Sequence, residues 1–196
     1  MDFVKGILIG LSVAAPVGPI GLLCIQRTMT HGRVIGFISG LGAATADALY
    51  GLIAGLGFTA VTHVLLEQQT WIRFIGGLFL AYLGIQTFRL KAARTPAQAR
   101  GGNAFTAYLS VLFLTLSNPM TILSFLAVFS SLGISPSSVF LFLCGVFFGS
   151  ALWWLFLSGM VGLFRQRLEE RYLTMINRLS GLLLLGFAVS AIYGIF

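Results

Sequence analysis

Long apolar stretches recur along the entire chain, separated by short polar clusters, and this pattern limits the fold more than any other feature of the sequence. About 20 apolar residues are enough for one helix to cross a bilayer, so the 196 residues leave room for six spans and short loops. Only 9% of the residues are charged, against about 25% in soluble domains, which excludes a soluble globule. We predict the spans at residues 3–25, 35–58, 72–88, 105–129, 139–164 and 179–196.

The spans are predicted to be helices rather than strands. Membrane barrels are built from alternating segments of about ten residues, and the apolar stretches do not alternate. An open sheet would leave backbone amides unpaired in hydrocarbon. We therefore predict an all-α polytopic membrane protein with a single transmembrane domain over residues 1–196. The first apolar stretch is too long for the core of a signal peptide and is interpreted as a mature helix.

An internal repeat is indicated when the sequence is shifted by 103 positions. Each half would hold three helices, and because three is an odd number, the second half would be inverted relative to the first. We predict a first three-helix repeat at residues 1–88, a basic cytoplasmic linker at 89–104 and a second repeat at 105–196. The coincident residues are Pro16 and Pro119, Gly42 and Gly145, the aromatic Tyr50 and Trp153, and, with one further position of shift, Gly77 and Gly181.

Prolines interrupt the first and the fourth span. Pro19 and Pro119 lack a backbone donor, so each would kink or break a helix. Proline is nevertheless well tolerated at the first position of a new helix, and Asn118 is a favoured N-cap. We predict that helices 1 and 4 are broken inside the membrane and that each new half-helix exposes amides able to hold a carboxylate; two simple kinks are the alternative. The predicted substrate-binding residues are Pro16, Gly18, Pro19, Asn118, Pro119 and Thr121.

Asp47 is the one acid well inside an apolar stretch. It lies about 18 Å from the start of the second span, in a hydrocarbon core of about 30 Å. A charge costs about 2.5–3.5 kcal/mol at that depth, so Asp47 is expected to face the bundle interior beside a proton, a cation or the free amides of the broken first helix. A carboxylate that caps those amides for purely structural reasons is the alternative.

The basic residues predict the orientation of the chain. Ten of the twelve Lys and Arg residues lie in the first, third and fifth loops, and only Lys5 and Arg73 lie on the other side. The positive-inside rule then puts the odd loops in the cytoplasm and both termini outside. We interpret the basic loops as determinants of topology rather than as a nucleic-acid surface. They carry Arg27, Arg33, Arg89, Lys91, Arg94, Arg100, Arg165, Arg167, Arg171 and Arg178.

No cofactor, metal site or catalytic constellation is predicted. Cys24 and Cys144 lie in apolar stretches and are interpreted as inert buried thiols. An intramembrane hydrolase would need a second acid or a histidine near Asp47, and the sequence offers neither. ATP-driven pumping is not expected because the chain has no Walker-type loop. The lipid bilayer is the expected partner, nucleic acid is not, and a homo-oligomer is left open.

Three motifs carry a resemblance to a known family. They are Gly18-Pro19 in the first span, a spaced series of glycines followed by Asp47 in the second, and Asn118-Pro119 in the fourth. The glycines of the series are Gly32, Gly36, Gly40 and Gly42. With them the whole chain resembles the lysine exporter (LysE/RhtB) family of bacterial amino-acid exporters. The resemblance implies a multi-pass protein of the bacterial inner membrane that exports amino acids or related small metabolites, coupled to protons. Many members have Lys after the Asn-Pro pair where this chain has Met120, so a lysine-type substrate is not implied.

Together these observations predict an exporter of small zwitterions. The α-carboxylate of the substrate would dock at the half-helix N-termini, while its ammonium group would compete with a proton for Asp47. Two alternatives are carried forward, a membrane scaffold that transports nothing and an exporter of a cation or another small solute. An enzyme is not predicted.

Overall fold

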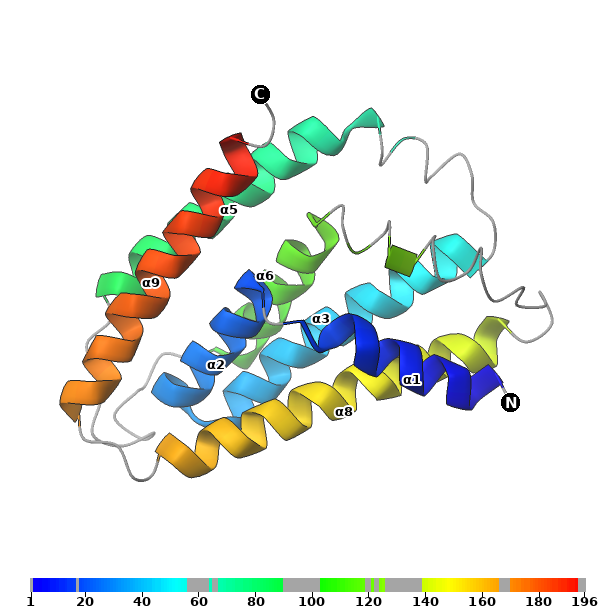
Figure 1. Ribbon diagram of the computed structural model, residues 1–196, viewed down its shortest axis with the longest axis horizontal. Helices are drawn as coiled ribbons and strands as arrows, with labels where there is room; N and C mark the ends of the chain where they lie inside the picture. Colours follow the sequence, from blue (N-terminus) through cyan, green and yellow to red (C-terminus); the bar gives the residue numbers. More distant parts are fainter. Residues whose placement is uncertain are drawn as a thin grey trace.

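The computed structural model consists of helices throughout the part of the chain that it describes, which confirms the predicted all-α class. The described residues are 2–16, 18–55, 64, 67–89, 103–118, 121, 124–125, 139–165 and 170–193. The helices are α1 (Asp2–Ala14), α2 (Pro19–His31), α3 (Arg33–Gly55), α5 (Gln69–Arg89), α6 (Ala104–Leu116), α8 (Val139–Arg165) and α9 (Glu170–Tyr193), and Figure 1 shows their arrangement.

Four of these helices, α3, α5, α8 and α9, are long and apolar enough to cross a membrane. The pair α1 and α2 forms a fifth candidate span that is bent by 83° at its break. The apolar helix α6 is shorter, with 13 residues. These helices fit a polytopic membrane protein, and the six-span arrangement stays a prediction.

The break in the first predicted span lies at its prolines. α1 ends at Ala14, and α2 begins with Pro19 after an extended Gly18 (φ −105°, ψ −160°). Proline tolerates this position because the first amides of a helix have no intrahelical acceptor. The backbone amide of Gly18 instead donates to the carbonyl of Pro16 at 3.1 Å. The predicted interruption at Pro119 lies outside the described residues.

Two helices extend beyond the apolar stretches that predicted them. α9 begins at Glu170 rather than at residue 179, and Arg171 and Arg178 lie within it. Arg27 lies within α2. Our placement of these three arginines in loops was therefore wrong, and three more basic residues are terminal residues of helices: Arg33 of α3, Arg89 of α5 and Arg165 of α8. Hydropathy marks only the part of a helix that lies in hydrocarbon. The helix can continue beyond that part, because a long cationic side chain on it reaches polar partners outside the hydrocarbon.

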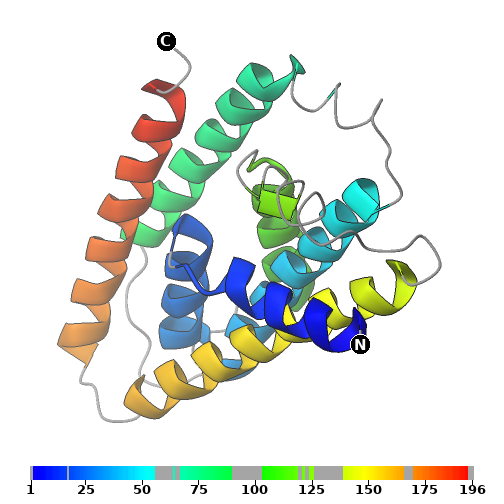
Figure 2. The same ribbon diagram turned by 45° about the vertical axis from the view of Figure 1, so that its right-hand side comes forward.

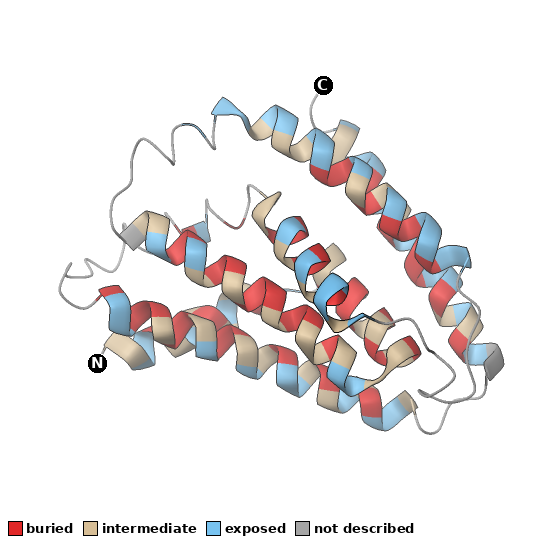
Figure 3. Ribbon diagram, turned by 180° about the vertical axis from the view of Figure 1, so that it is seen from behind, coloured by how far each residue is buried: buried red, intermediate tan, exposed pale blue. Residues whose placement is uncertain are grey.

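The antiparallel pair α3 and α8 forms the centre of the bundle. α1 packs along α8 and α6 along α3, whereas α5 and α9 pair on one side with α2 between them and the rest (Figures 1 and 2). Buried residues concentrate on the facing sides of these helices, and the outward faces of α5 and α9 are exposed (Figure 3). These outward faces are apolar, as a lipid-facing surface requires; they carry Ile75, Leu78, Leu182 and Val189.

Glycines allow α1 and α8 to approach until their backbones touch. A Cβ atom on Gly6 would overlap the carbonyl of Phe142, and one on Gly145 would overlap the carbonyl of Phe3. Small residues of this kind are the usual means of close helix packing in membranes. The contact holds α1 in place up to the break that follows it.

The contacts between α3 and α8 are reciprocal under the 103-residue shift. A Cβ atom on Gly40 would overlap the base of the Trp154 side chain. The counterparts of these two residues are Leu143 and Gly51, and they also meet, with Leu143 Cδ2 2.7 Å from the Cβ position of Gly51. Helices α3 and α8, which the 103-residue shift aligns, therefore make the same kind of contact at two places.

The pair α5 and α9 shows the same reciprocity with a shift of one further residue. Ile192 Cγ1 lies 2.9 Å from the Cβ position of Gly77, and Phe88 Cβ lies 2.7 Å from that of Gly181. Gly77 corresponds to Gly181, and Phe88 corresponds to Ile192, in the alignment of the two halves. Both helix pairs, α3 with α8 and α5 with α9, are antiparallel, and the division of the chain into two inverted repeats stays a prediction.

Candidate functional site

A cavity of about 290 Å³, here named the central cavity, lies beside the break between α1 and α2. Its volume approaches the lower end of the range of small-ligand pockets, about 300–1,000 Å³. Five of the six predicted substrate-binding residues and Asp47 line it, and Pro119 lies outside the described residues. The lining residues are Val13, Ala14, Pro16, Gly18, Pro19, Ile20, Gly21, Ala43, Asp47, Thr115, Asn118, Thr121, Ser124 and Trp154.

Asp47 is 4% exposed and is the charged member of the described lining. The Ser150 hydroxyl donates to Asp47 Oδ2 at 2.8 Å, and the indole Nε1 of Trp154 donates to Ser150 Oγ at 3.2 Å. A chain of hydrogen bonds thus runs from the α3 carboxyl group to α8. Because Trp154 also lines the cavity, both ends of this chain lie at the same cavity.

The N-terminus of α2 opens into the same cavity. Its N-cap residue is Gly18, which has no side chain to bind the first amides of the helix. The first-turn residues Ile20 and Gly21 line the cavity, and no other described residue beyond the chain neighbours comes within 4 Å of the Cβ position of Gly18. A helix N-terminus carries a partial positive charge. The cavity therefore combines an anionic side chain with a site that favours an anionic ligand.

The end of α6 forms the opposite wall. The Tyr50 hydroxyl on α3 donates to the carbonyl of Leu116, the last residue of α6. Beyond it, the carbonyl of Asn118 accepts a hydrogen bond from the Thr121 amide at 3.1 Å. An N-cap residue makes this kind of contact with the first turn that follows it. The half-helix that we predicted to follow lies mostly outside the described residues.

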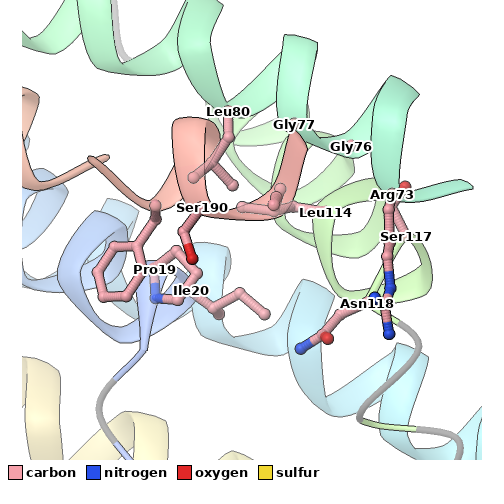
Figure 4. Close-up of a pocket in the computed structure, with 12 residues that line it drawn as sticks. Pro19, Ile20, Arg73, Gly76, Gly77, Leu80, Leu114, Ser117, Asn118 and Ser190 are labelled. Carbon is pink, nitrogen blue, oxygen red and sulfur yellow. The ribbon is translucent and has the colours of Figure 1, made fainter. Parts of the chain in front are cut away.

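A second cavity of about 390 Å³, here named the side cavity, lies on the other side of Pro19, Ile20 and Asn118. It lies between the start of α2, the first half of α5, the end of α6 and one face of α9 (Figure 4). Its lining residues are Pro19, Ile20, Arg73, Gly76, Gly77, Leu80, Leu114, Ser117, Asn118, Phe187, Ser190 and Ala191.

Polar contacts fasten the opposite end of α2 to α9. Gln26 Nε2 and Thr30 Oγ1 both lie within hydrogen-bond distance of Asn177 Oδ1, at 3.1 and 3.0 Å. All three side chains are at most 5% exposed. Buried hydrogen bonds of this kind fix the position of α2 against α9.

Two arginines fasten the same end of α2 to other helices. Arg27 donates to Ser110 Oγ at 2.7 Å and to the carbonyl of Ala107 at 2.8 Å, both on α6, and to Ser39 Oγ on α3 at 3.1 Å. Arg165, at the end of α8, donates to the carbonyls of Met29 and Thr30. A cation is favourable there because the last carbonyls of a helix carry a partial negative charge. We name these contacts the polar belt; it comprises Gln26, Arg27, Thr30, Ser39, Ser110, Arg165 and Asn177.

Comparison with known proteins assigns the chain to a family. The family model of the LysE type translocator matches residues 11–194. The chain belongs to the LysE type translocator family. LysE translocators are transporters rather than enzymes, so the scaffold alternative is wrong and the chain is a multi-pass membrane transporter.

The curated relatives of this LysE translocator agree with that assignment. The chain is 30% identical to the candidate amino acid efflux protein YcgF of Bacillus subtilis (strain 168), an alignment that covers 94% of this chain and 92% of YcgF. It is 27% identical to the uncharacterized membrane protein YahN of Escherichia coli (strain K12), over 86% of this chain and 79% of YahN. No solved structure matches the chain significantly.

Two residues that lie next to Asp47 carried too weak a signal in the sequence to be singled out. Ser150 and Trp154 belong to no motif of the sequence. The structure gives both of them hydrogen bonds that lead to Asp47. The 103-residue shift, which brings Asp47 onto Ser150, was the signal that could have identified the serine.

Proposed function

We propose that this LysE translocator exports amino acids or similar small zwitterions across the bacterial inner membrane in exchange for protons. One observation carries the proposal: Asp47 and the glycine-capped N-terminus of α2 line the same cavity. A zwitterion has one group for each of them. The name of the relative YcgF, which refers to amino acid efflux, supports the same substrate class.

The substrate would be held at both of its charged ends. Its carboxylate would bind the free amides at the start of α2, where the helix dipole favours an anion. Its ammonium group would bind the Asp47 carboxylate, which is otherwise costly to keep charged in the membrane interior. The side chains of Asn118 and Thr121 would close the other wall of the cavity.

Proton coupling would follow from competition at Asp47. A carboxylate can neutralise its charge with a proton or with the substrate's ammonium group, but one oxygen pair cannot hold both. The hydroxyl of Ser150 would keep the carboxylate oriented toward the cavity in the empty state. Binding of a proton from outside would then release the substrate, which is the exchange that antiport requires.

Alternating access would arise from two inverted three-helix repeats that rock against each other. The reciprocal contacts of α3 with α8 and of α5 with α9 support this division at residues 1–88 and 105–196. In the orientation with both termini outside, the polar belt lies on the cytoplasmic side. Its bonds join α2 of the first repeat to α6, α8 and α9 of the second, so they would have to break before the site opens to the cytoplasm.

The proposal is tested by transport into everted vesicles that carry an imposed pH gradient and are offered a panel of labelled amino acids. Asp47→Asn should lower gradient-driven transport about 10- to 100-fold, the equivalent of a charged hydrogen bond worth about 1.5–3 kcal/mol. Asp2→Asn is the matched control, since Asp2 is paired with Lys5 at the surface. Gradient-driven transport by Asp47→Asn at the normal rate would contradict the coupling role. Absence of transport for every amino acid in the panel would contradict the substrate class.

A further inference from the structure

We propose that the side cavity receives the side chain of the substrate and that Arg73 selects for side chains ending in a carboxylate over those ending in a cation. This inference rests on the proposed function and adds a substrate class to it. It starts from the charges of the two cavities: Asp47 in the central cavity and Arg73 in the side cavity are the charged residues of their described linings.

The two cavities adjoin each other at the residues proposed to bind the substrate. Pro19, Ile20 and Asn118 line both of them. A carboxylate held at the start of α2 would therefore have its α-carbon between the two cavities. The ammonium group would point to Asp47, and the side chain is the part of the molecule left to enter the side cavity.

The walls of the side cavity suit a short aliphatic chain with a polar end. Leu80, Leu114 and Phe187 supply apolar surface for methylene groups. Ser190 lies close to Pro19 and Ile20, where Figure 4 shows its hydroxyl directed at them. Gly76 adds no side chain of its own, and its Cβ position lies 2.9 Å from Ser117 Cβ, so α5 sits close against the end of α6.

Arg73 supplies the charge at the far end of the cavity. It lies one turn into α5 and is half-buried, and Figure 4 shows its guanidinium group beside Ser117 and Asn118. A guanidinium group binds a carboxylate through two parallel hydrogen bonds. An ammonium or guanidinium group in the same place would be repelled by the like charge of the half-buried Arg73. Arg73 is therefore a specificity-determining residue in this proposal.

A different explanation of Arg73 predicts a different result. An arginine near the end of a spanning helix can reach the interface and bind lipid phosphate there, which anchors the helix. An anchor affects every substrate equally, because it acts on the position of α5. A specificity residue changes the ratio between substrates, so that ratio is the quantity to measure.

The experiment uses proteoliposomes loaded with glutamate, glutamine or lysine, and it measures the initial rate of efflux under a pH gradient. Wild type should export glutamate faster than lysine. Arg73→Glu should reverse the order, and Arg73→Gln should lower the glutamate-to-glutamine ratio about 10- to 100-fold, the effect of one charged hydrogen-bonding group. Arg73→Lys should retain part of the preference. Arg89→Glu, at the opposite end of α5 and outside the lining of both cavities, is the matched control and should leave the ratios unchanged.

Each other outcome overturns a definite part of the reasoning. Ratios that stay constant in Arg73→Glu and Arg73→Gln, with glutamine efflux still dependent on Asp47, would overturn the role of Arg73 alone. An equal decrease for all three amino acids would assign Arg73 to lipid anchoring and would overturn it as well. If wild type exported none of the three but did transport other amino acids of the panel, this inference would fall and the proposed function would stand; if it transported no amino acid at all, both would fall. Arg73→Gln keeps the test valid if Arg73→Glu does not insert into the membrane.

Discussion

The contact between α1 and α8 yields a prediction that depends on geometry alone. Gly145 and Gly159 lie on the same helix, so the substitutions Gly145→Ala and Gly159→Ala add the same methyl group to the same element. At Gly145 the new Cβ atom would overlap the Phe3 carbonyl and lie 2.9 Å from Gly6 Cα, both of which are backbone atoms. At Gly159 no atom of the described residues lies within 4 Å of the Cβ position.

The two variants should therefore change stability in opposite directions. Ala is favoured over Gly in a helix interior by about 0.5–1 kcal/mol, and this gain is shared by both positions. Overpacking costs about 1–3 kcal/mol, and at Gly145 the cost cannot be relieved by rotating a side chain because the clashing atoms belong to the backbone. The free energy of unfolding should thus be lower for Gly145→Ala than for Gly159→Ala by about 1–3 kcal/mol.

The assay is reversible unfolding of the purified protein in mixed micelles titrated with a denaturing detergent, with helix content as the signal. Transport should fall in Gly145→Ala as well, since α1 leads directly to the break that lines the central cavity. Equal unfolding free energies for the two variants would refute the close approach of α1 to α8. A Gly145→Ala variant more stable than Gly159→Ala would refute it more strongly, because no overpacking cost would then offset the gain that Ala has over Gly in a helix.

Three further predictions concern the site and the polar belt. Trp154→Phe keeps an aromatic ring but removes the indole donor, so efflux should fall about two- to tenfold for one neutral hydrogen bond; because Trp154 is buried, the smaller ring should also lower the unfolding free energy. Pro19→Ala frees the backbone at the start of α2 while Pro16 keeps the break, so efflux should fall while the unfolding free energy changes by at most about 1 kcal/mol. Arg165→Gln removes the charged donor that holds the end of α2, so alkylation of the buried Cys24 in a Cys144→Ser background should become about tenfold faster or more.

The features that the sequence predicted are those that depend on local chemistry. A long apolar segment predicts a helix, and a proline without a backbone donor predicts a break in one. The structure has the helices and the break at Pro19. A single acid in hydrocarbon must turn inward, and Asp47 is buried. The polar belt could not be predicted in this way. Its members are ordinary polar residues far apart in the chain, such as Gln26 and Asn177, and their pairing follows only from how the helices pack.

The position of Asp47 gives a physical reason for the two halves to differ in sequence there. Under the proposed repeat its counterpart is Ser150, and the two are hydrogen-bonded to each other, so they lie at the centre of the pseudosymmetry. Identical halves would bring two carboxyl groups to hydrogen-bond distance, where both cannot be charged at once. An acid opposed by a hydroxyl donor leaves one charge, which a single proton or a single ammonium group can neutralise. A Ser150→Asp variant would restore the symmetry and should retain a proton between the two carboxyl groups, so that export of a neutral amino acid loses its dependence on the pH gradient; undiminished coupling in that variant would show that the centre of the pseudosymmetry is not where exchange occurs.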